Sequence, residues 1–264
     1  TLAKERVSNL ISLHPDNEKA QKLYFDIYRN ENAVEMIVSS YQRDKSNVKK
    51  ALLASEALVR FEKYEGAYDI LSHVKQDAKL PKKYWQLLLV VYKQQQNESQ
   101  LLSTLESWRK NSPFHIEPIV LLVEFYSKKR DYNRALTLLN QSLEYNTDNL
   151  ILKLVKMQIL LNAKELYQAK ELYRVIEKQD IKAELKLGME GRILLLEDDF
   201  DLAIPKLSGF YKAYPSAQNL IYLASAYQGS GNERKAIEVL EDFLVDTDNE
   251  QVKAILANIY LNSN

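Results

Sequence analysis

The sequence predicts an all-α protein made of repeated helical pairs, and three observations lead to this prediction. Gly and Pro number only 6 each in 264 residues, while Leu, Ala, Lys, Glu, Gln and Tyr dominate, a composition that favours helices over strands. Apolar residues make up 46% of the chain and charged residues 27%, enough apolar material to bury a core and to exclude disorder. A phrase of apolar, small and aromatic residues recurs about every 34 residues.

The repeated phrase is clearest near the C-terminal end. In helix-turn-helix spacing, it contains Leu223, Ala224, Tyr227, Gly231, Ala236, Leu240 and Phe243. Steps of 33 or 34 residues toward the N-terminus find further copies, with Gly191 and Pro215 in one and Trp85 in another. A small residue is needed where two helices cross closely. We therefore expect the alanines of the second helices to be among the most buried residues: Ala67, Ala135, Ala169, Ala203 and Ala236.

The phrase resembles the tetratricopeptide repeat, a 34-residue helical pair with an aromatic, Leu-Gly, Tyr, Ala, a second aromatic and Pro in that order. Trp85 stands where this family has its Trp. The resemblance implies a right-handed α–α superhelix, the tetratricopeptide-repeat (TPR) solenoid, whose repeats stack into a continuous core with a concave inner wall. It also implies a non-catalytic scaffold that binds other proteins.

The resemblance covers essentially the whole chain as a single solenoid, residues 1–264. We expect seven full repeats at 18–47, 48–81, 82–115, 116–149, 150–183, 184–216 and 217–249, with partial repeats at 1–17 and 250–264. The partial repeats indicate a piece of a longer array. Because no neighbouring repeat covers them, such ends would expose apolar residues and self-associate. The residues concerned are Val7 and Leu10 at one end and Leu256, Ala257 and Tyr260 at the other.

The sequence carries no pattern of catalytic or metal-binding residues. Its three His residues are isolated, and Cys is absent. Gly188 and Gly191 lie inside an expected helix, where they indicate close packing rather than a phosphate-binding loop. The acidic run at 197–201 falls in an interhelical turn, where helix capping is a simpler role than cation binding. We therefore expect no enzymatic activity, cofactor, metal or small-molecule substrate.

In TPR proteins, set positions of each first helix face the concave groove that receives a partner. The early repeats place basic residues there: Lys19, Lys22, Arg29, Lys49, Arg60 and Lys83. The later repeats contribute a more apolar wall: Leu154, Gln158, Leu161, Leu185, Arg192, Leu195, Ile221 and Gln228. Such a groove suits a protein or peptide segment with an acidic end and an apolar end. The alternative for the basic wall is solvated charge that binds nothing.

Two further expectations concern this groove. Chaperone-binding TPR proteins hold a C-terminal carboxylate with a Lys and an Asn of one first helix. No repeat here offers that pair, since Lys22 is followed by Asp26, so that clamp is not expected. Most Tyr residues fall at core positions of the pattern, and the exceptions, which are candidates for surface or groove contacts, are Tyr24, Tyr41, Tyr145 and Tyr222.

The charge distribution bears on the kind of partner. The net charge is zero, yet Lys and Arg outnumber Asp and Glu by 21 to 16 in residues 1–130 and are outnumbered by 20 to 15 in residues 131–264. A nucleic-acid partner is disfavoured because neither an overall basic excess nor a basic run occurs. A peptide-responsive regulator and, less favoured, an RNA-binding helical repeat remain alternatives to the protein-interaction scaffold.

The long regular repeats, rich in Lys, Asn, Gln and Tyr, resemble those of bacterial proteins. The phrases Asn219–Gly231 and Leu256–Leu261 resemble those of TPR lipoproteins associated with exosortase (PEP-CTERM) protein-sorting and exopolysaccharide systems. This resemblance implies an exported protein that faces the periplasm. The absence of Cys fits the periplasm and a reducing cytoplasm equally. The compartment therefore stays open between the bacterial periplasm, with or without a lipid anchor on a longer protein, and the cytoplasm.

Overall fold

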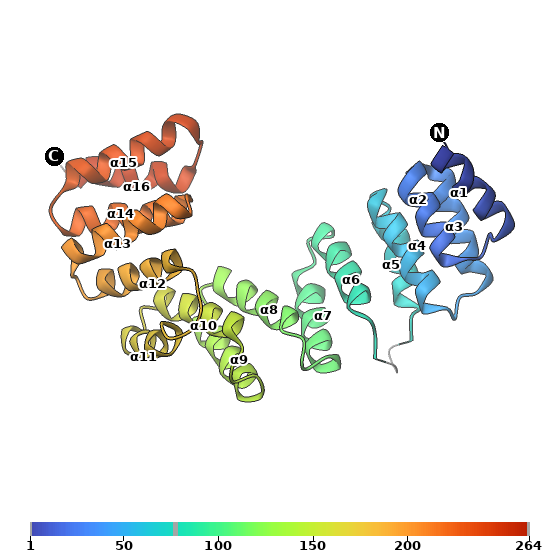
Figure 1. Cartoon of the computed structure of the whole chain (residues 1–264), viewed down its shortest axis with the longest axis horizontal. Coiled ribbons are helices and arrows are strands. Elements are labelled where there is room, and N and C mark those ends of the chain that lie inside the picture. Colours follow the sequence, from blue (N-terminus) through green and yellow to red (C-terminus); the bar gives the residue numbers. More distant parts are fainter. Residues whose placement is uncertain (1, 76–78, 263–264) are drawn as a thin grey trace. The chain divides into compact units, whose positions relative to one another are not determined.

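The computed structural model describes residues 2–75 and 79–262, which form sixteen α-helices and no strand (Figure 1). The fold class predicted from the sequence, all-α, is confirmed. The chain divides into two compact units, residues 1–122 and residues 123–264. Residues 1, 76–78, 263 and 264 fall within predicted repeat intervals and lie outside the described residues.

The first unit contains seven complete helices and the start of an eighth. They are α1 (Leu2–Leu13), α2 (Glu18–Tyr28), α3 (Glu31–Arg43), α4 (Val48–Arg60), α5 (Tyr64–Ser72), α6 (Lys82–Gln94) and α7 (Glu98–Asn111), followed by α8 (Glu117–Lys128). From α1 to α7, each helix packs against the next one along the chain. In addition, α2 contacts α4, and α4 contacts α6.

The second unit contains the end of α8 and eight complete helices. They are α9 (Tyr132–Tyr145), α10 (Leu150–Asn162), α11 (Leu166–Ile176), α12 (Ala183–Leu196), α13 (Phe200–Ala213), α14 (Ala217–Gly229), α15 (Glu233–Asp246) and α16 (Glu250–Asn262). Successive helices from α9 to α16 pack together, and α10, α12, α14 and α16 also contact one another in that order.

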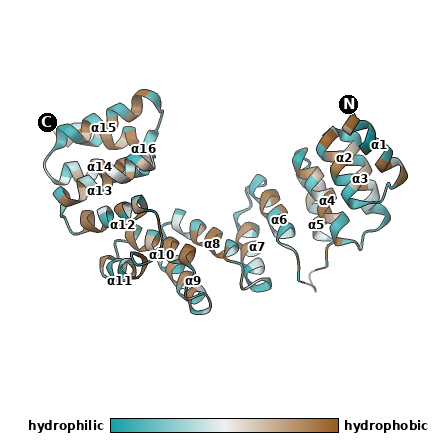
Figure 2. Cartoon of the chain, viewed as in Figure 1, coloured by the Kyte–Doolittle hydropathy of each residue, from teal (hydrophilic) through white to brown (hydrophobic). Residues whose placement is uncertain are grey.

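Within each unit, the even-numbered helices form a row of direct neighbours, which we call the even row. Among the described residues, the odd-numbered helices contact only the helices before and after them in the chain. This is the sequential two-layer packing of a TPR-type solenoid, in which each helical pair buries its apolar stripe against the next pair. Figure 2 shows that polar and apolar residues share the same helices, as this packing requires.

The turn between the two helices of a pair recurs with the same backbone geometry. Its central residue is left-handed, with φ between 51° and 78°, at Glu62, Gln96, Arg130, Lys164, Asp198 and Gly231. These positions are 34 residues apart, except for the last step of 33. After each of them, a backbone N–H donates to the carbonyl five residues earlier at 2.8–3.0 Å, for example Asn232 to Tyr227. This bond stops the first helix in a Schellman-type turn.

Asn residues start many of the helices. Their side-chain oxygens accept a backbone N–H of the first turn, which supplies a partner that the helix cannot. The Asn caps with such a bond are Asn17, Asn30, Asn47, Asn97, Asn149, Asn232 and Asn249. In α4, the Asn47 cap at the start and the left-handed turn at Glu62 together set the length of the helix.

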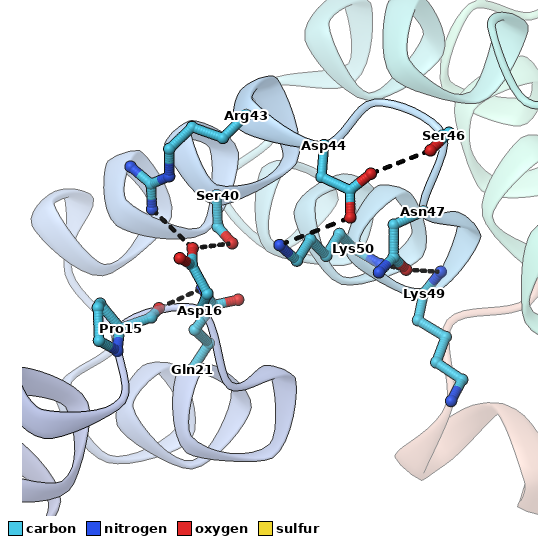
Figure 3. A network of polar contacts seen from close by, with 10 residues as sticks. All are labelled: Pro15, Asp16, Gln21, Ser40, Arg43, Asp44, Ser46, Asn47, Lys49 and Lys50. Atoms are coloured by element: carbon cyan, nitrogen blue, oxygen red, sulfur yellow. Dashed lines mark hydrogen bonds and ion pairs between the residues drawn. The ribbon is translucent and has the colours of Figure 1, made fainter.

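A polar network fastens the turn before α2 to the end of α3 (Figure 3). The Asp16 carboxylate accepts hydrogen bonds from the Ser40 hydroxyl at 3.1 Å and from the Arg43 guanidinium at 2.9 Å. The bonds from Arg43 and then Ser40 hold the pKa of Asp16 below its ordinary value, because they favour the charged carboxylate. In the next such turn, Asn47 accepts the backbone N–H of Lys50 at 3.2 Å.

Small residues lie where helices cross, as the sequence predicted. The five second-helix alanines are completely buried, which confirms that prediction: Ala67, Ala135, Ala169, Ala203 and Ala236. A Cβ atom added to Gly188 would lie 2.7 Å from the Phe210 ring, and one added to Gly191 would lie 2.7 Å from Leu207. The close approach of α12 and α13 therefore needs glycine at both positions.

Two expectations about single residues are wrong. Tyr41 is only 3% exposed, because α3 turns this residue toward the core rather than to the surface. Val7 is 6% exposed and is covered, where partial exposure was expected. In the acidic run, Asp199 is the N-cap residue of α13 without a side-chain capping bond, and Asp201 lies in the first turn of that helix. The expected exposure of Tyr145 is confirmed at 80%.

The repeat boundaries stay a prediction, as does a single solenoid over the whole chain. Each of the seven predicted intervals holds two helices, for example α12 and α13 for 184–216, although α12 starts one residue earlier. Leu10 and Tyr260 are 39% and 43% exposed. Self-association through the terminal helices also stays a prediction.

Two Gly→Ala substitutions should change stability in opposite directions. Gly231 has a φ of +78° and no atom within 4 Å of an added Cβ, so Gly231→Ala should lower the free energy of unfolding by about 1 kcal/mol through backbone strain alone. Gly66 lies inside α5, and its added Cβ would meet Leu58 at an ordinary 3.5 Å. Gly66→Ala should raise the same free energy by about 0.5–1 kcal/mol. Urea unfolding followed by circular dichroism measures both; a rise in the free energy of unfolding for Gly231→Ala would contradict the turn geometry.

Candidate functional site

The predicted basic wall of the first unit is a series of ion pairs. The Lys22 ammonium lies 3.3 Å from the Asp26 carboxylate, which lies 2.9 Å from the Arg60 guanidinium. Arg60 also pairs with Glu56 at 2.9 Å, and Glu56 pairs with Lys83 at 3.1 Å. Opposite charges therefore alternate across the even row α2, α4 and α6. Three of the six predicted basic residues are therefore paired within the wall itself.

The other three basic residues predicted for this wall do not take part in those ion pairs. Lys19 and Lys49 are exposed near the starts of α2 and α4. Arg29 ends α2 in a left-handed conformation, and its Nε donates to the backbone carbonyl of Asp26 at 3.2 Å. Exposed single charges of this kind carry little binding energy on their own. Lys19, Lys49 and Arg29 therefore add exposed charge to this row.

The second unit has a cleft of about 220 Å³ on its even row, which we call the apolar cleft. Side chains of α10, α12 and α13 form its apolar walls: Leu154, Met157, Leu185, Met189 and Phe210. Leu154 and Leu185 are half-buried, so apolar surface remains accessible there. The small size of Gly188 in this lining lets the Phe210 ring approach α12.

A second cleft of about 520 Å³, the wide cleft, adjoins the apolar cleft. Its own lining comes from α9, α10, α12, α14 and the turn after α10: Tyr132, Asn162, Lys164, Leu195, Leu196, Ile221 and Ser225. The two clefts share five lining residues: Gln158, Leu161, Arg192, Gln218 and Tyr222. Arg192 therefore lies where the two clefts meet.

Arg192 is held by neutral groups from two neighbouring helices. Its Nη1 donates to the Gln158 side-chain oxygen and its Nη2 to the Asn162 side-chain oxygen, both at 2.8 Å. The guanidinium lies over the Tyr222 ring, 4.3 Å from the centroid. Only 6% of the residue is exposed. Burial lowers the pKa of the Arg192 guanidinium, and the Tyr222 hydroxyl acts in the opposite direction. The group stays charged at neutral pH.

The structure brings together seven of the eight residues predicted for the later part of the groove. Leu154, Gln158, Leu161, Leu185, Arg192, Leu195 and Ile221 all line one cleft or both, and Gln228 does not. Leu161 and Arg192 are buried, at 4% and 6% exposure, where open groove positions were expected. Contact of any of these residues with a partner stays a prediction.

Sequence reasoning missed some of the lining. Asn162 lies four residues after Gln158 on the same face of α10, a spacing that could have identified it. Tyr222 was separated from the core tyrosines by its place off the repeat pattern, and it does line both clefts. Phe210 stands at the second aromatic position of the repeated phrase, which indicates packing inside the repeat rather than at a cleft. Gln218 gives no sequence signal, because its position depends on how α14 packs beside α12.

Other kinds of site find no support in the described residues. Nowhere in 2–75 or 79–262 do three His, Cys, Asp or Glu side chains gather closely enough to hold a metal ion. Within the same ranges, none of the helices combines the length and apolar character that spanning a bilayer demands.

No protein-family model matches the chain, and no curated protein matches it in sequence. Solved structures match it in fold. A tetratricopeptide repeat protein from Parabacteroides merdae is 11% identical with a TM-score of 0.63, over 97% of this chain and 99% of that one. YrrB, described as a TPR protein with an unusual peptide-binding site, is 14% identical with a TM-score of 0.52, over 70% of this chain and 96% of its own.

A third match is to the hetero-tetramer Cut9–Hcn1 of the APC/C, at 13% identity and a TM-score of 0.58. The match covers 98% of this chain and 52% of the other, so the chain spans about half the length of that relative. At these identities the likeness concerns the fold. It shows that the described helices pack in sequence as those of TPR solenoids do.

Replacing Arg192 with Met should not destabilise the protein. A buried guanidinium without a carboxylate partner costs desolvation energy, and Met fills a similar volume without charge. The free energy of unfolding should stay unchanged or rise by up to about 2 kcal/mol, whereas the benchmark Leu160→Ala should lower it by about 2–5 kcal/mol at a fully buried position. Chemical unfolding measures both, and a loss above about 1 kcal/mol for Arg192→Met would give Arg192 a structural role instead.

Proposed function

We propose that the chain is a non-catalytic protein-interaction module, which holds a segment of a partner polypeptide in the two adjoining clefts of α10, α12 and α14. The observation that carries this proposal is the pair of clefts on one even row. Peptide sites combine apolar walls with a few placed polar groups, and both are present here. The even row suits an extended ligand because the odd-numbered helices pack on its other side.

Comparison of the two units supports this choice of surface. In the first unit, charged residues of the even row form ion pairs with one another, from Lys22 through Asp26 and Arg60 to Lys83. In the second unit, α10 is apolar around most of its surface: Ile151 is 54% exposed and Leu154 is half-buried. Apolar side chains left accessible on a helix that already packs against both neighbours are typical of an interaction surface.

The more specific assignments stay predictions. A place in a bacterial sorting, export or exopolysaccharide system rests on the sequence resemblance alone, and so does a periplasmic location. A peptide-responsive regulator would use the same clefts, with binding of the segment changing the activity of an attached domain. RNA binding is the less favoured alternative, because the clefts contain only Arg192 and Lys164 as basic residues.

Selection from a phage-displayed library of random peptides tests the proposed function. The wild-type protein should enrich peptides, and amide hydrogen exchange with a synthetic copy should show protection in α10, α12 and α14. The double variant Leu154→Asp, Leu185→Asp should lose binding by about a hundredfold or more, because two charges enter the apolar wall, while its helical circular dichroism stays unchanged.

The control for this variant is Leu202→Asp, which adds the same charge at a leucine of α13 that is 62% exposed and lines neither cleft. Its peptide binding should equal that of the wild type. If no peptide is enriched, or if Leu154→Asp, Leu185→Asp binds as well as the control, the clefts are not the interaction surface.

A further inference from the structure

We propose that Arg192 is a receptor for the carboxylate of an Asp or Glu side chain within the partner segment, and that a bulky apolar residue beside this acid fills the apolar cleft. This inference rests on the proposed function and defines the chemistry of its ligand. With Arg192 in this role, the clefts select a segment that has an acidic residue next to an apolar one.

Arg192 has no opposite charge beside it among the described residues. Five arginines form ion pairs with carboxylates of their own or of a neighbouring helix or turn: Arg43, Arg60, Arg109, Arg134 and Arg174. Arg192 is far more buried than these, yet its acceptors in the described residues are two neutral amides. A buried charge without an opposite charge is costly, and a ligand carboxylate would supply that charge.

The charges on the opposite side of α12 sharpen the contrast. There the Glu190 carboxylate pairs with the Lys206 ammonium at 2.6 Å and accepts the Tyr173 hydroxyl at 2.6 Å. Burial acts to raise the pKa of Glu190, but the bonds from Lys206 and Tyr173 outweigh it and hold the pKa below its ordinary value. Glu190 is thus paired with an opposite charge outside the clefts, whereas Arg192, inside them, has only neutral acceptors.

The Arg192 guanidinium is also held in a fixed orientation by its neighbours. Gln158 and Asn162 each accept one N–H, and the guanidinium carbon lies over the Tyr222 ring, so the fork is held in one direction before any ligand arrives. A guanidinium has five N–H donors, of which two have acceptors among the described residues. The remaining donors can bind a carboxylate through two parallel hydrogen bonds, the strongest geometry for this pair.

The position of Arg192 between the two clefts indicates that the acid is a side chain within the partner segment rather than its C-terminus. Arg192 lines both clefts, so a segment that lies across it continues into each of them. A C-terminal carboxylate would leave one cleft empty. The five apolar residues that form the walls of the apolar cleft accept a bulky apolar side chain on one side of the acid. On the other side, the exposed Lys164 at the wide cleft adds positive charge that also favours an acidic segment.

The test uses synthetic copies of peptides enriched by the wild-type protein, each paired with a copy in which the acidic residue becomes its amide, Glu→Gln or Asp→Asn. Fluorescence anisotropy gives the Kd of both copies with the wild type and with Arg192→Met. On the wild type, the amide should weaken binding by about thirtyfold or more, as for a buried charge pair. On Arg192→Met, the two copies should bind within about twofold of each other, because the coupling is gone.

The matched control is Arg174→Met, which removes an exposed arginine that pairs with Glu171 and lines neither cleft. It should keep the full preference for the acidic copy. Unfolding of Arg192→Met by heat, compared with the wild type, confirms that the variant is folded. A second variant, Arg192→Lys, should keep part of the preference, since Lys retains the charge but not the fork.

The outcomes separate the two proposals. Enriched peptides without a shared acid, or an acid preference that survives in Arg192→Met, would overturn the carboxylate receptor while leaving the clefts as the binding surface. An acid preference lost in both Arg192→Met and Arg174→Met would reduce it to general charge attraction and would overturn it as well. A library that yields no binders at all would reject the proposed function and this inference together.

Discussion

The backbone turn that ends the first helix of each pair is the constraint on which the rest of the structure depends. A left-handed residue and an N–H···O=C bond five residues back occur at the same point of six successive pairs. The turn fixes where the second helix starts, and therefore which residues of the two helices meet. Completely buried alanines such as Ala169 and Ala203 are the consequence, because that meeting point leaves no room for a larger side chain.

Once the pairs are fixed in this way, the even-numbered helices become neighbours of one another and their side chains interact at a separation of one repeat. In the first unit this interaction is ionic: Arg60 meets Asp26, 34 residues earlier in the chain. In the second unit the same separation brings Arg192 to Gln158. The same geometry thus produces ion pairs in the first unit. In the second unit it places neutral side-chain amides around a buried cation.

The contrast gives the clefts their chemical character. Where acids and bases alternate, each charge is partly solvated and paired, so little energy is left for a ligand. Where a cation is buried among Gln158, Asn162 and Tyr222, its solvation is incomplete, and a ligand carboxylate gains what the protein lacks. The two glycines of α12 add to this, since the close approach of α13 places Phe210 in the apolar wall.

The sequence by itself determined the helical class, the 34-residue period, the buried alanines and fewer than half of the residues that line the two clefts. These follow from local spacing, because a helix and a repeated turn place every residue of a given register on the same face. Tertiary structure decided which of those residues share charges and which are covered. Lys22 and Arg60 were predicted as free basic residues, and Asp26 neutralises both across two helices.

Arg192 was predicted as an open groove residue, and packing of α10 and α14 beside α12 buries it under Tyr222. The physical reason is that periodicity gives the direction of a side chain, whereas its charge partner and its burial depend on the identity of residues one repeat away in each direction.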